Sequence, residues 1–175
     1  MASLTDRMIR AAKFDTTLYE EVEADRDATG QAMSVVILSS LAMGLSSLSR
    51  VGLMGLIGGT LVALVGWFIW ALLTYWIGTR LLPEPQTQTD LGQMLRTTGF
   101  SSSPGVLRIL GIIPGLWVFV TFATGVWMLA AMVIAVRQAL DYRGTGRALG
   151  VCVLGWLLQW VFVLFLYGYS RSFQP

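Results

Sequence analysis

Residues 51–79 read VGLMGLIGGTLVALVGWFIWALLTYWIGT, a run that contains no Asp, Glu, Lys or Arg. A helix needs about 20 consecutive apolar residues to cross a hydrocarbon core of about 30 Å, and this run is long enough. Three further uncharged apolar runs occupy residues 28–49, 109–136 and 148–170. With 55% hydrophobic residues, 13% charged residues and a mean hydropathy of +0.67, the chain of 175 residues is predicted to be an all-α integral membrane protein.

The first two membrane spans are predicted to form a tight hairpin. The first span covers residues 30–48, with Asp27 or Thr29 as its N-cap, and the second covers residues 56–79. Arg50 lies between them with few residues to spare. The two helices should therefore be antiparallel neighbours.

The third uncharged run, residues 109–136, has an awkward length. A helix over its 28 residues measures about 42 Å, which is too long for one ordinary crossing and short for two. One tilted helix gives a four-span bundle. A break near residues 121–125 gives a five-span transmembrane helical bundle, with spans at 105–121 and 125–140 before the last span at 148–168.

Cationic residues favour five spans with a cytoplasmic N-terminus, because the inner loops of membrane proteins are rich in Lys and Arg. Five spans place ten cationic residues inside and two outside, whereas four spans place eight inside and four outside. The five-span arrangement requires Arg108 and Arg137 to lie at the cytoplasmic edge. The inner set consists of Arg7, Arg10, Lys13, Arg26, Arg80, Arg96, Arg108, Arg137, Arg143 and Arg147, and the outer set of Arg50 and Arg171.

Three regions follow from this assignment. Residues 1–28 are predicted to form an amphipathic cytoplasmic arm, residues 29–170 the five-span membrane domain, and residues 171–175 a short outer tail. Asp15 should cap a second short helix within the arm. The arm has no apolar core followed by a small-residue cleavage site, so we expect no cleavable signal peptide.

Basic residues gather in the first half of the arm and acidic residues in the second half. The basic half is predicted to lie on anionic headgroups, with Arg7, Arg10 and Lys13 as the membrane-surface residues. The acidic half would then meet a protein partner. The alternative is an interfacial anchor that only fixes the topology.

The loop after the second span begins with Pro83 and Pro85, which should end the preceding helix. A short amphipathic helix is predicted next, capped by Thr89 or Asp90. Met94 is among the apolar residues expected to face the membrane interface.

Small residues recur four positions apart in the apolar runs. This spacing lets helix backbones approach closely, so we expect packing within the chain, with self-association as the alternative. Pro114 lies within one of these pairs and predicts a helix kink. The helix-packing residues are Gly55, Gly59, Gly111, Gly115, Gly146 and Gly150.

The composition excludes several classes of protein. The chain has no His and a single Cys152, and the predicted spans carry no ionisable group near their middle. We therefore expect no enzyme activity, no catalytic residue, no metal site and no bound cofactor. The net charge of +2 argues against a nucleic-acid partner. Because Lys13 is the one Lys among twelve cationic residues, we expect a bacterial source and the cytoplasmic (inner) membrane.

Two segments resemble the Yip domain family, five-span membrane proteins with a cytoplasmic arm. Residues 95–104 read LRTTGFSSSP and lead to Pro114, so Gly99, Phe100, Pro104 and Pro114 are similar to the family's entry to its third span; AVRQAL at 135–140 resembles the loop before its last span. The resemblance implies a prokaryotic-type, non-enzymatic protein of membrane organisation. In the arm, Tyr-Glu-Glu stands where eukaryotic members have Tyr-Gly-Pro, so the resemblance does not imply binding of a Rab-type GTPase.

A membrane scaffold or adaptor is therefore the predicted function, with the lipid bilayer and a protein partner or membrane complex contacted through the arm or a bundle face. An accessory subunit of a large respiratory or photosynthetic complex is the alternative, since seven Trp and short outer loops suit such a role. A small transporter or pore is the least supported class, because coupled transport usually requires ionisable groups inside the membrane.

Overall fold

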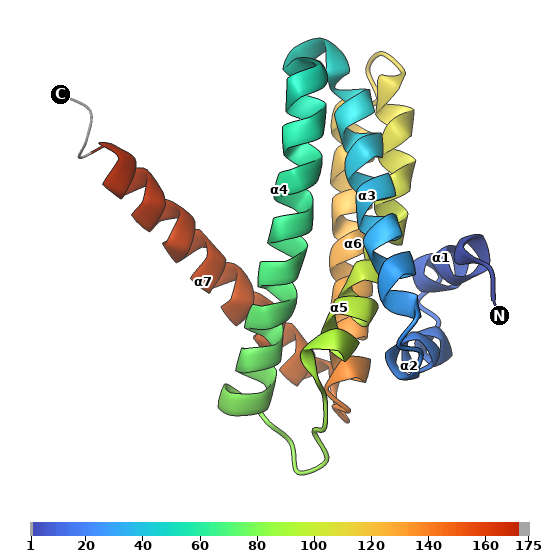
Figure 1. Ribbon diagram of the computed structural model, residues 1–175, viewed down its shortest axis with the longest axis vertical. Coiled ribbons are helices and arrows are strands. Elements are labelled where there is room, and N and C mark those ends of the chain that lie inside the picture. Colours follow the sequence, from blue (N-terminus) through green and yellow to red (C-terminus); the bar gives the residue numbers. More distant parts are fainter. Residues whose placement is uncertain (1, 172–175) are drawn as a thin grey trace.

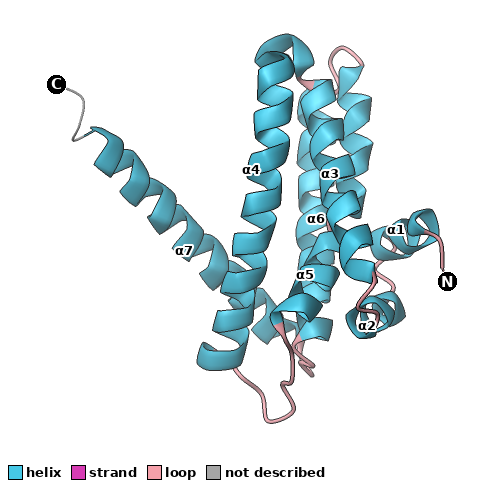
Figure 2. Cartoon of the chain, viewed as in Figure 1, coloured by secondary structure: helices cyan, strands magenta, loops and turns pink. Residues whose placement is uncertain are grey.

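The computed structural model describes residues 2–171, with side chains as far as residue 161 (Figures 1 and 2), and this part of the chain contains helices and no strand. The predicted outer tail, 171–175, lies almost wholly outside the described residues. In chain order the elements are α1 (Leu4–Ala12), α2 (Thr16–Ala24), α3 (Ala28–Ser46), α4 (Leu48–Trp76), the π-helical turn η1 (Ile77–Leu81), α5 (Leu91–Phe100), the 3₁₀ helix η2 (Ser103–Ile112), α6 (Trp117–Ala139) and α7 (Thr145–Arg171).

The arm consists of α1 and α2, and the predicted break between them is confirmed. Asp15 is the N-cap of α2, and its carboxylate accepts a hydrogen bond from the Thr17 amide at 3.0 Å. Phe14 has a φ of 63°, and its left-handed backbone turns the chain back, so that α2 lies beside α1.

The predicted hairpin of α3 and α4 is also confirmed. Asp27 precedes α3 as its N-cap, and Ser47 joins the two helices. Gly52, with a φ of 65°, interrupts α4 soon after it begins. A Cβ on Gly44 would lie 2.2 Å from a methyl carbon of Leu56, so the absence of a side chain at Gly44 permits the close approach of the two helices.

The helix after the proline loop belongs to the bundle and not to the membrane interface. Asp90 caps α5 in a capping box with Gln93, as the sequence predicted. Met94, however, is fully buried in the core with Val136 and Leu140, so the prediction that it faces the interface is wrong. Together α5 and η2 run along α3 and α6 as one interrupted rod (Figure 1).

The predicted break at residues 121–125 is wrong, because α6 is continuous from Trp117 to Ala139. The hydroxyl of Thr124 donates to the Val120 carbonyl at 2.7 Å and leaves the helix intact. The chain turns earlier, at residues 113–116, where Gly115 has a φ of 84°. Pro114 lies in this turn between two helices and therefore does not kink one, since Pro restricts the residue before it to extended backbone.

This turn also places Arg108 differently from the prediction. Arg108 lies in η2, where its Nε donates to Thr124 Oγ1 at 3.2 Å, and it shares a cavity with Ser47 at the α3–α4 turn. Thr124 and Arg137 are about 20 Å apart along α6. Arg108 and Arg137 therefore lie toward opposite ends of the bundle, and their placement at one edge is wrong.

The last helix, α7, packs on the bundle through its first turns. Ala148, Val151 and Cys152 are buried against Ile77 and Leu140, so Cys152 is a packing residue. Farther along, α7 inclines away from α4 (Figure 1).

Three helices in the described residues are long and apolar enough to cross a membrane: Ala28–Ser46, Leu48–Leu81 with its π-helical turn, and Trp117–Ala139. The described apolar part of α7, Thr145–Val161, is shorter.

Candidate functional site

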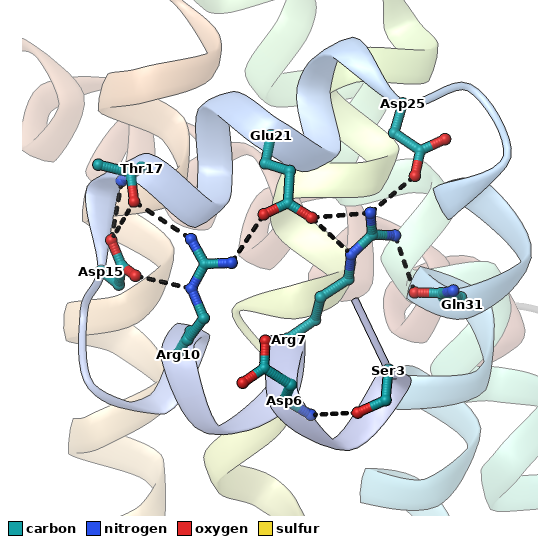
Figure 3. Close-up of polar contacts among 9 residues, drawn as sticks. All are labelled: Ser3, Asp6, Arg7, Arg10, Asp15, Thr17, Glu21, Asp25 and Gln31. Carbon is teal, nitrogen blue, oxygen red and sulfur yellow. Dashed lines mark hydrogen bonds and ion pairs between the residues drawn. The ribbon is translucent and has the colours of Figure 1, made fainter. Parts of the chain in front are cut away.

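The arm formed by α1 and α2 is held together by a cluster of ion pairs (Figure 3). The Arg7 guanidinium donates to Glu21 and Asp25, both at 2.8 Å, and to Gln31 of α3 at 3.0 Å. Arg10 binds the other oxygen of Glu21 at 2.7 Å and Asp15 at 2.8 Å. Glu21 therefore joins the two arginines of α1, and Arg7 links both arm helices to the first long helix.

These contacts shift the acidity of the carboxyl groups. Hydrogen bonds from Arg10, and then from Thr17, lower the pKa of Asp15 to about 2. Arg10 likewise holds the pKa of Glu21 below its ordinary value, and Arg7 does the same for Asp25. The cluster is therefore fully ionised at neutral pH.

Apolar contacts attach the arm to the bundle. Leu18, Tyr19 and Val22 are fully buried against residues of α3, α5 and α6, including Phe100 and Ala135. Their removal from water supplies about 1.5–3 kcal/mol for each large side chain. The arm is thus a docked part of the fold.

Two polar contacts complete the docking. Arg96 of α5 is 5% exposed, and its Nε donates to the Val22 carbonyl at 2.8 Å while its Nη2 donates to the Glu23 carbonyl. Both acceptors lie in the last turn of α2, where backbone carbonyls lack helical partners and a cation is favourable. On the other side, Trp127 Nε1 donates to the Ala12 carbonyl at 2.7 Å.

Glu23 differs from the other acidic residues of the arm. Burial, followed by the nearby charge of Asp141, raises the pKa of Glu23 to about 7. Tyr19 is buried as well, and its burial raises the pKa of its hydroxyl. The end of the arm near Asp141 is therefore sensitive to pH in the neutral range, unlike the arginine cluster.

The three predicted membrane-surface cations lie in different environments. Arg7 is only 4% exposed and faces carboxylates, and Arg10 is also held in ion pairs. Lys13 is exposed beside Ile9, which is 50% exposed. The separation of basic and acidic residues along the sequence predicted contact of the basic half with lipid headgroups. In the structure α2 folds back on α1, and its acidic residues form ion pairs with Arg7 and Arg10.

The residues that carried the family resemblance lie where α5 meets η2. Phe100 is fully buried, and Pro104 lies buried in the first turn of η2. A Cβ on Gly99 would lie 2.7 Å from the Ala32 Cβ, so the lack of a side chain lets α5 lie directly against α3. Pro114 is exposed in the turn before α6.

The predicted helix-packing glycines occupy varied environments. A Cβ on Gly59 or Gly146 would meet no atom of the described chain within 4 Å, and a Cβ on Gly55 would meet only Val51 of its own helix. A Cβ on Gly150 would lie 3.6 Å from a methyl carbon of Leu82, and a Cβ on Gly111 would lie close to Ser46 and Trp117. Because Gly115 lies in the turn, it shares no helix with Gly111. Self-association through any of them stays a prediction.

A partly open cavity of about 480 Å³ lies between α3, α4, η2 and α6, with Gln159 of α7 at its side. Arg108, Ser39 and Ser102 line it, and on α4 the wall includes Gly55 and Gly59. Sequence reasoning missed this site, because Arg108 was assigned to a membrane edge. Arg108 lies five residues before the 113–116 turn, so a turn predicted at Pro114 and Gly115 would have placed Arg108 near that end of the bundle.

The helical architecture, with its long apolar helices and a covering arm, defines an integral membrane protein of the all-α class. A family model for the Yip1 domain matches residues 16–167. The chain therefore belongs to the Yip1 domain family, and the resemblance found in the sequence is confirmed. No curated protein and no solved structure is significantly similar to it.

Proposed function

We propose that the chain is a non-enzymatic membrane scaffold or adaptor and that its docked arm is the surface bound by a protein partner. The observation that carries this proposal is the attachment of α1 and α2 to the bundle through Arg96, Trp127 and buried apolar side chains. A docked arm presents one defined surface, whereas a loose tail would have to be ordered on binding. Membership of the Yip1 domain family is consistent with a role in the membrane.

The same proposal includes five crossings of the bilayer. In Figure 1, α3, α4, the α5–η2 rod and α6 run between the two ends of the bundle in alternating directions, and α7 starts at the end where α6 finishes and inclines away from α4. The ten residues of α5 measure about 15 Å and the ten of η2 about 20 Å, enough together to cross a core of about 30 Å. The third crossing is thus this rod and not a span at 105–121.

Charge supports a cytoplasmic arm in this arrangement. With Arg108 moved to the outer half, nine cationic residues lie on the inner side and three on the outer side, which still follows the positive-inside rule. All ten acidic residues, at positions 6–27, 84, 90 and 141, fall on the inner side as well. The C-terminus is then outside.

Quantitative co-purification tests the scaffold role. The full-length chain would be purified from its native membrane in mild detergent, and its partners would be compared with those of Arg96→Gln, which should weaken arm docking, and of Arg80→Gln, a substitution in η1. We expect a partner that is lost with Arg96→Gln and kept with Arg80→Gln. A stoichiometric energy-converting complex retained by both variants would instead support the accessory-subunit function.

A further inference from the structure

The cavity within the bundle holds a cation that the protein does not neutralise. Arg108 Nε donates to the neutral hydroxyl of Thr124, while no described residue forms an ion pair or hydrogen bond with its two terminal nitrogens. The ten acidic residues all lie outside the segments 28–83 and 91–140, which supply the cavity walls apart from Gln159. A half-buried guanidinium without a counter-ion in a mostly apolar bundle favours an anionic ligand.

Two hydroxyl donors line the same cavity. Ser39 and Ser102 line the cavity, and neither hydroxyl makes a hydrogen bond within the described part of the chain. Ser39 is 4% exposed, and its Oγ lies against η2, because a Cβ on Gly105 would be only 1.9 Å from it. Hydroxyl and guanidinium donors without a carboxylate suit an anion with several acceptor oxygens, as in a phosphate group.

The rest of the cavity lining is mostly apolar, and the cavity has room for more than a small ion. The α4 wall includes Gly59 and Gly66, where a Cβ would meet no described atom, and Met128 and Trp70 also line the cavity. A volume of about 480 Å³ lies in the range of pockets that hold organic ligands of 300–1,000 Å³. The lining therefore combines a few hydrogen-bond donors with apolar side chains.

The depth of Arg108 agrees with a lipid. Arg108 precedes the 113–116 turn by five residues of 3₁₀ helix, about 10 Å along its axis. The polar layer on each side of a bilayer is about 5–8 Å thick, so this guanidinium lies just below headgroup level. An amphipathic molecule could place its phosphate at Arg108 and its chains along the apolar wall.

We propose that this cavity binds a phosphate-bearing ligand, with Arg108 on the phosphate, the Ser39 hydroxyl one turn of η2 away, and the α4 glycine wall beside the apolar part of the ligand. The phosphate could belong to a phospholipid headgroup or be free inorganic phosphate. Only the phospholipid would need the apolar wall, which would contact its chains. The proposal does not depend on the scaffold role, because the arm contributes no residue to this cavity.

The test uses purified full-length chain in uncharged detergent and measures binding by native mass spectrometry and by the shift in melting temperature. The probes are phosphatidylglycerol, a diacylglycerol with the same chains, and inorganic phosphate. Arg108→Gln removes the cation, and Gly59→Leu fills the cavity at a position where a Cβ meets no described atom. Matched controls are Arg50→Gln, whose guanidinium lies 4.2 Å above the Trp117 ring, and Gly58→Leu, where a Cβ also meets no described atom.

Phosphatidylglycerol should bind the wild type and both controls at least about tenfold more tightly than Arg108→Gln and Gly59→Leu, because a charge-assisted contact to phosphate is lost or blocked. Diacylglycerol should give no comparable stabilisation. Without ligand, Arg108→Gln should melt at a higher temperature than the wild type, since an unpaired charge has been removed. This last result separates ligand loss from misfolding.

Inorganic phosphate that binds the wild type as tightly as the lipid, with the same dependence on Arg108, would support the proposal with free phosphate as the source. Equal binding of phosphatidylglycerol by Arg108→Gln and wild type would overturn it. The proposal would also be overturned if diacylglycerol bound as tightly as phosphatidylglycerol, or if Gly58→Leu and Gly59→Leu weakened phosphatidylglycerol binding to the same extent.

Discussion

Replacing Arg96 with Gln is expected to release the arm while the bundle stays folded. The Arg96 guanidinium donates to two carbonyls in the last turn of α2, at Val22 and Glu23, and a hydrogen bond from a charged donor contributes about 1.5–3 kcal/mol. The freed carbonyls can be hydrated when the arm opens, and the Gln amide can reach one of them. The net loss in docking free energy should therefore be about 2–4 kcal/mol.

Hydrogen exchange measures this loss directly. Each 1.4 kcal/mol changes an equilibrium tenfold, so amides around Leu18 and Val22 should exchange about 30- to 1,000-fold faster in Arg96→Gln. Arg96→Lys keeps the charge but has a single donor group, so its arm exchange rates should lie between those of the wild type and Arg96→Gln. Arg80→Gln should exchange at the wild-type rate. Arm exchange within about threefold of wild type would refute the reasoning, as would equal acceleration in α3 and α6.

Four other expected outcomes follow from single side chains. The pKa of Glu23 is raised to about 7 from an ordinary 4.5, so between these pH values the docked arm binds a proton that the open arm releases. The contribution of Glu23 to arm docking should therefore be largest below pH 4.5, decrease as the pH rises toward 7, and stay constant above that. Glu23→Gln should remove this dependence, and exchange rates of the two proteins compared at each pH would show it. Gly99→Ala should destabilise the fold by about 1–3 kcal/mol, since its Cβ would overlap Ala32, whereas Gly30→Ala, with no described atom within 4 Å, should stabilise it by about 0.5–1 kcal/mol; thermal unfolding in detergent compares them. Trp127→Phe loses the bond to the Ala12 carbonyl, and limited trypsin digestion should cut at Lys13 about fivefold faster. Tyr142→Phe removes a hydroxyl shared by the carbonyls of Gly78 and Leu82, at 3.1 and 2.7 Å, and should weaken the η1 end of the bundle by about 1 kcal/mol in amide exchange.

The long apolar helices and the two-helix arm could be predicted because each depends on local signals. Runs without charge and the cap at Asp15 are properties of neighbouring residues. The α5–η2 rod could not be recognised from an uncharged apolar run, since it contains Arg96, Thr97 and Thr98. These residues are buried, and the Thr97 hydroxyl donates to the Gln93 carbonyl at 3.0 Å, so polar groups that suggested a surface helix are satisfied inside the bundle.

The two candidate sites depend on contacts between distant residues. Glu21 lies eleven positions from Arg10 and fourteen from Arg7, and the chain reversal at Phe14 is what brings these charges together. Arg108 was misplaced for a related reason. Its depth depends on where the chain turns, and the Pro114–Gly115 turn was read as part of a helix.

The third crossing, by α5 and η2, is tested most directly by labelling single cysteines from outside the membrane. In a Cys152→Ser background, Ile113→Cys lies in the turn before α6, Thr87→Cys in the loop before α5 and Arg143→Cys in the loop before α7. A membrane-impermeant maleimide added to intact cells should label Ile113→Cys, and should reach the other two only after the membrane is permeabilised. Labelling of Arg143→Cys in intact cells, with Ile113→Cys protected until permeabilisation, would contradict the third crossing.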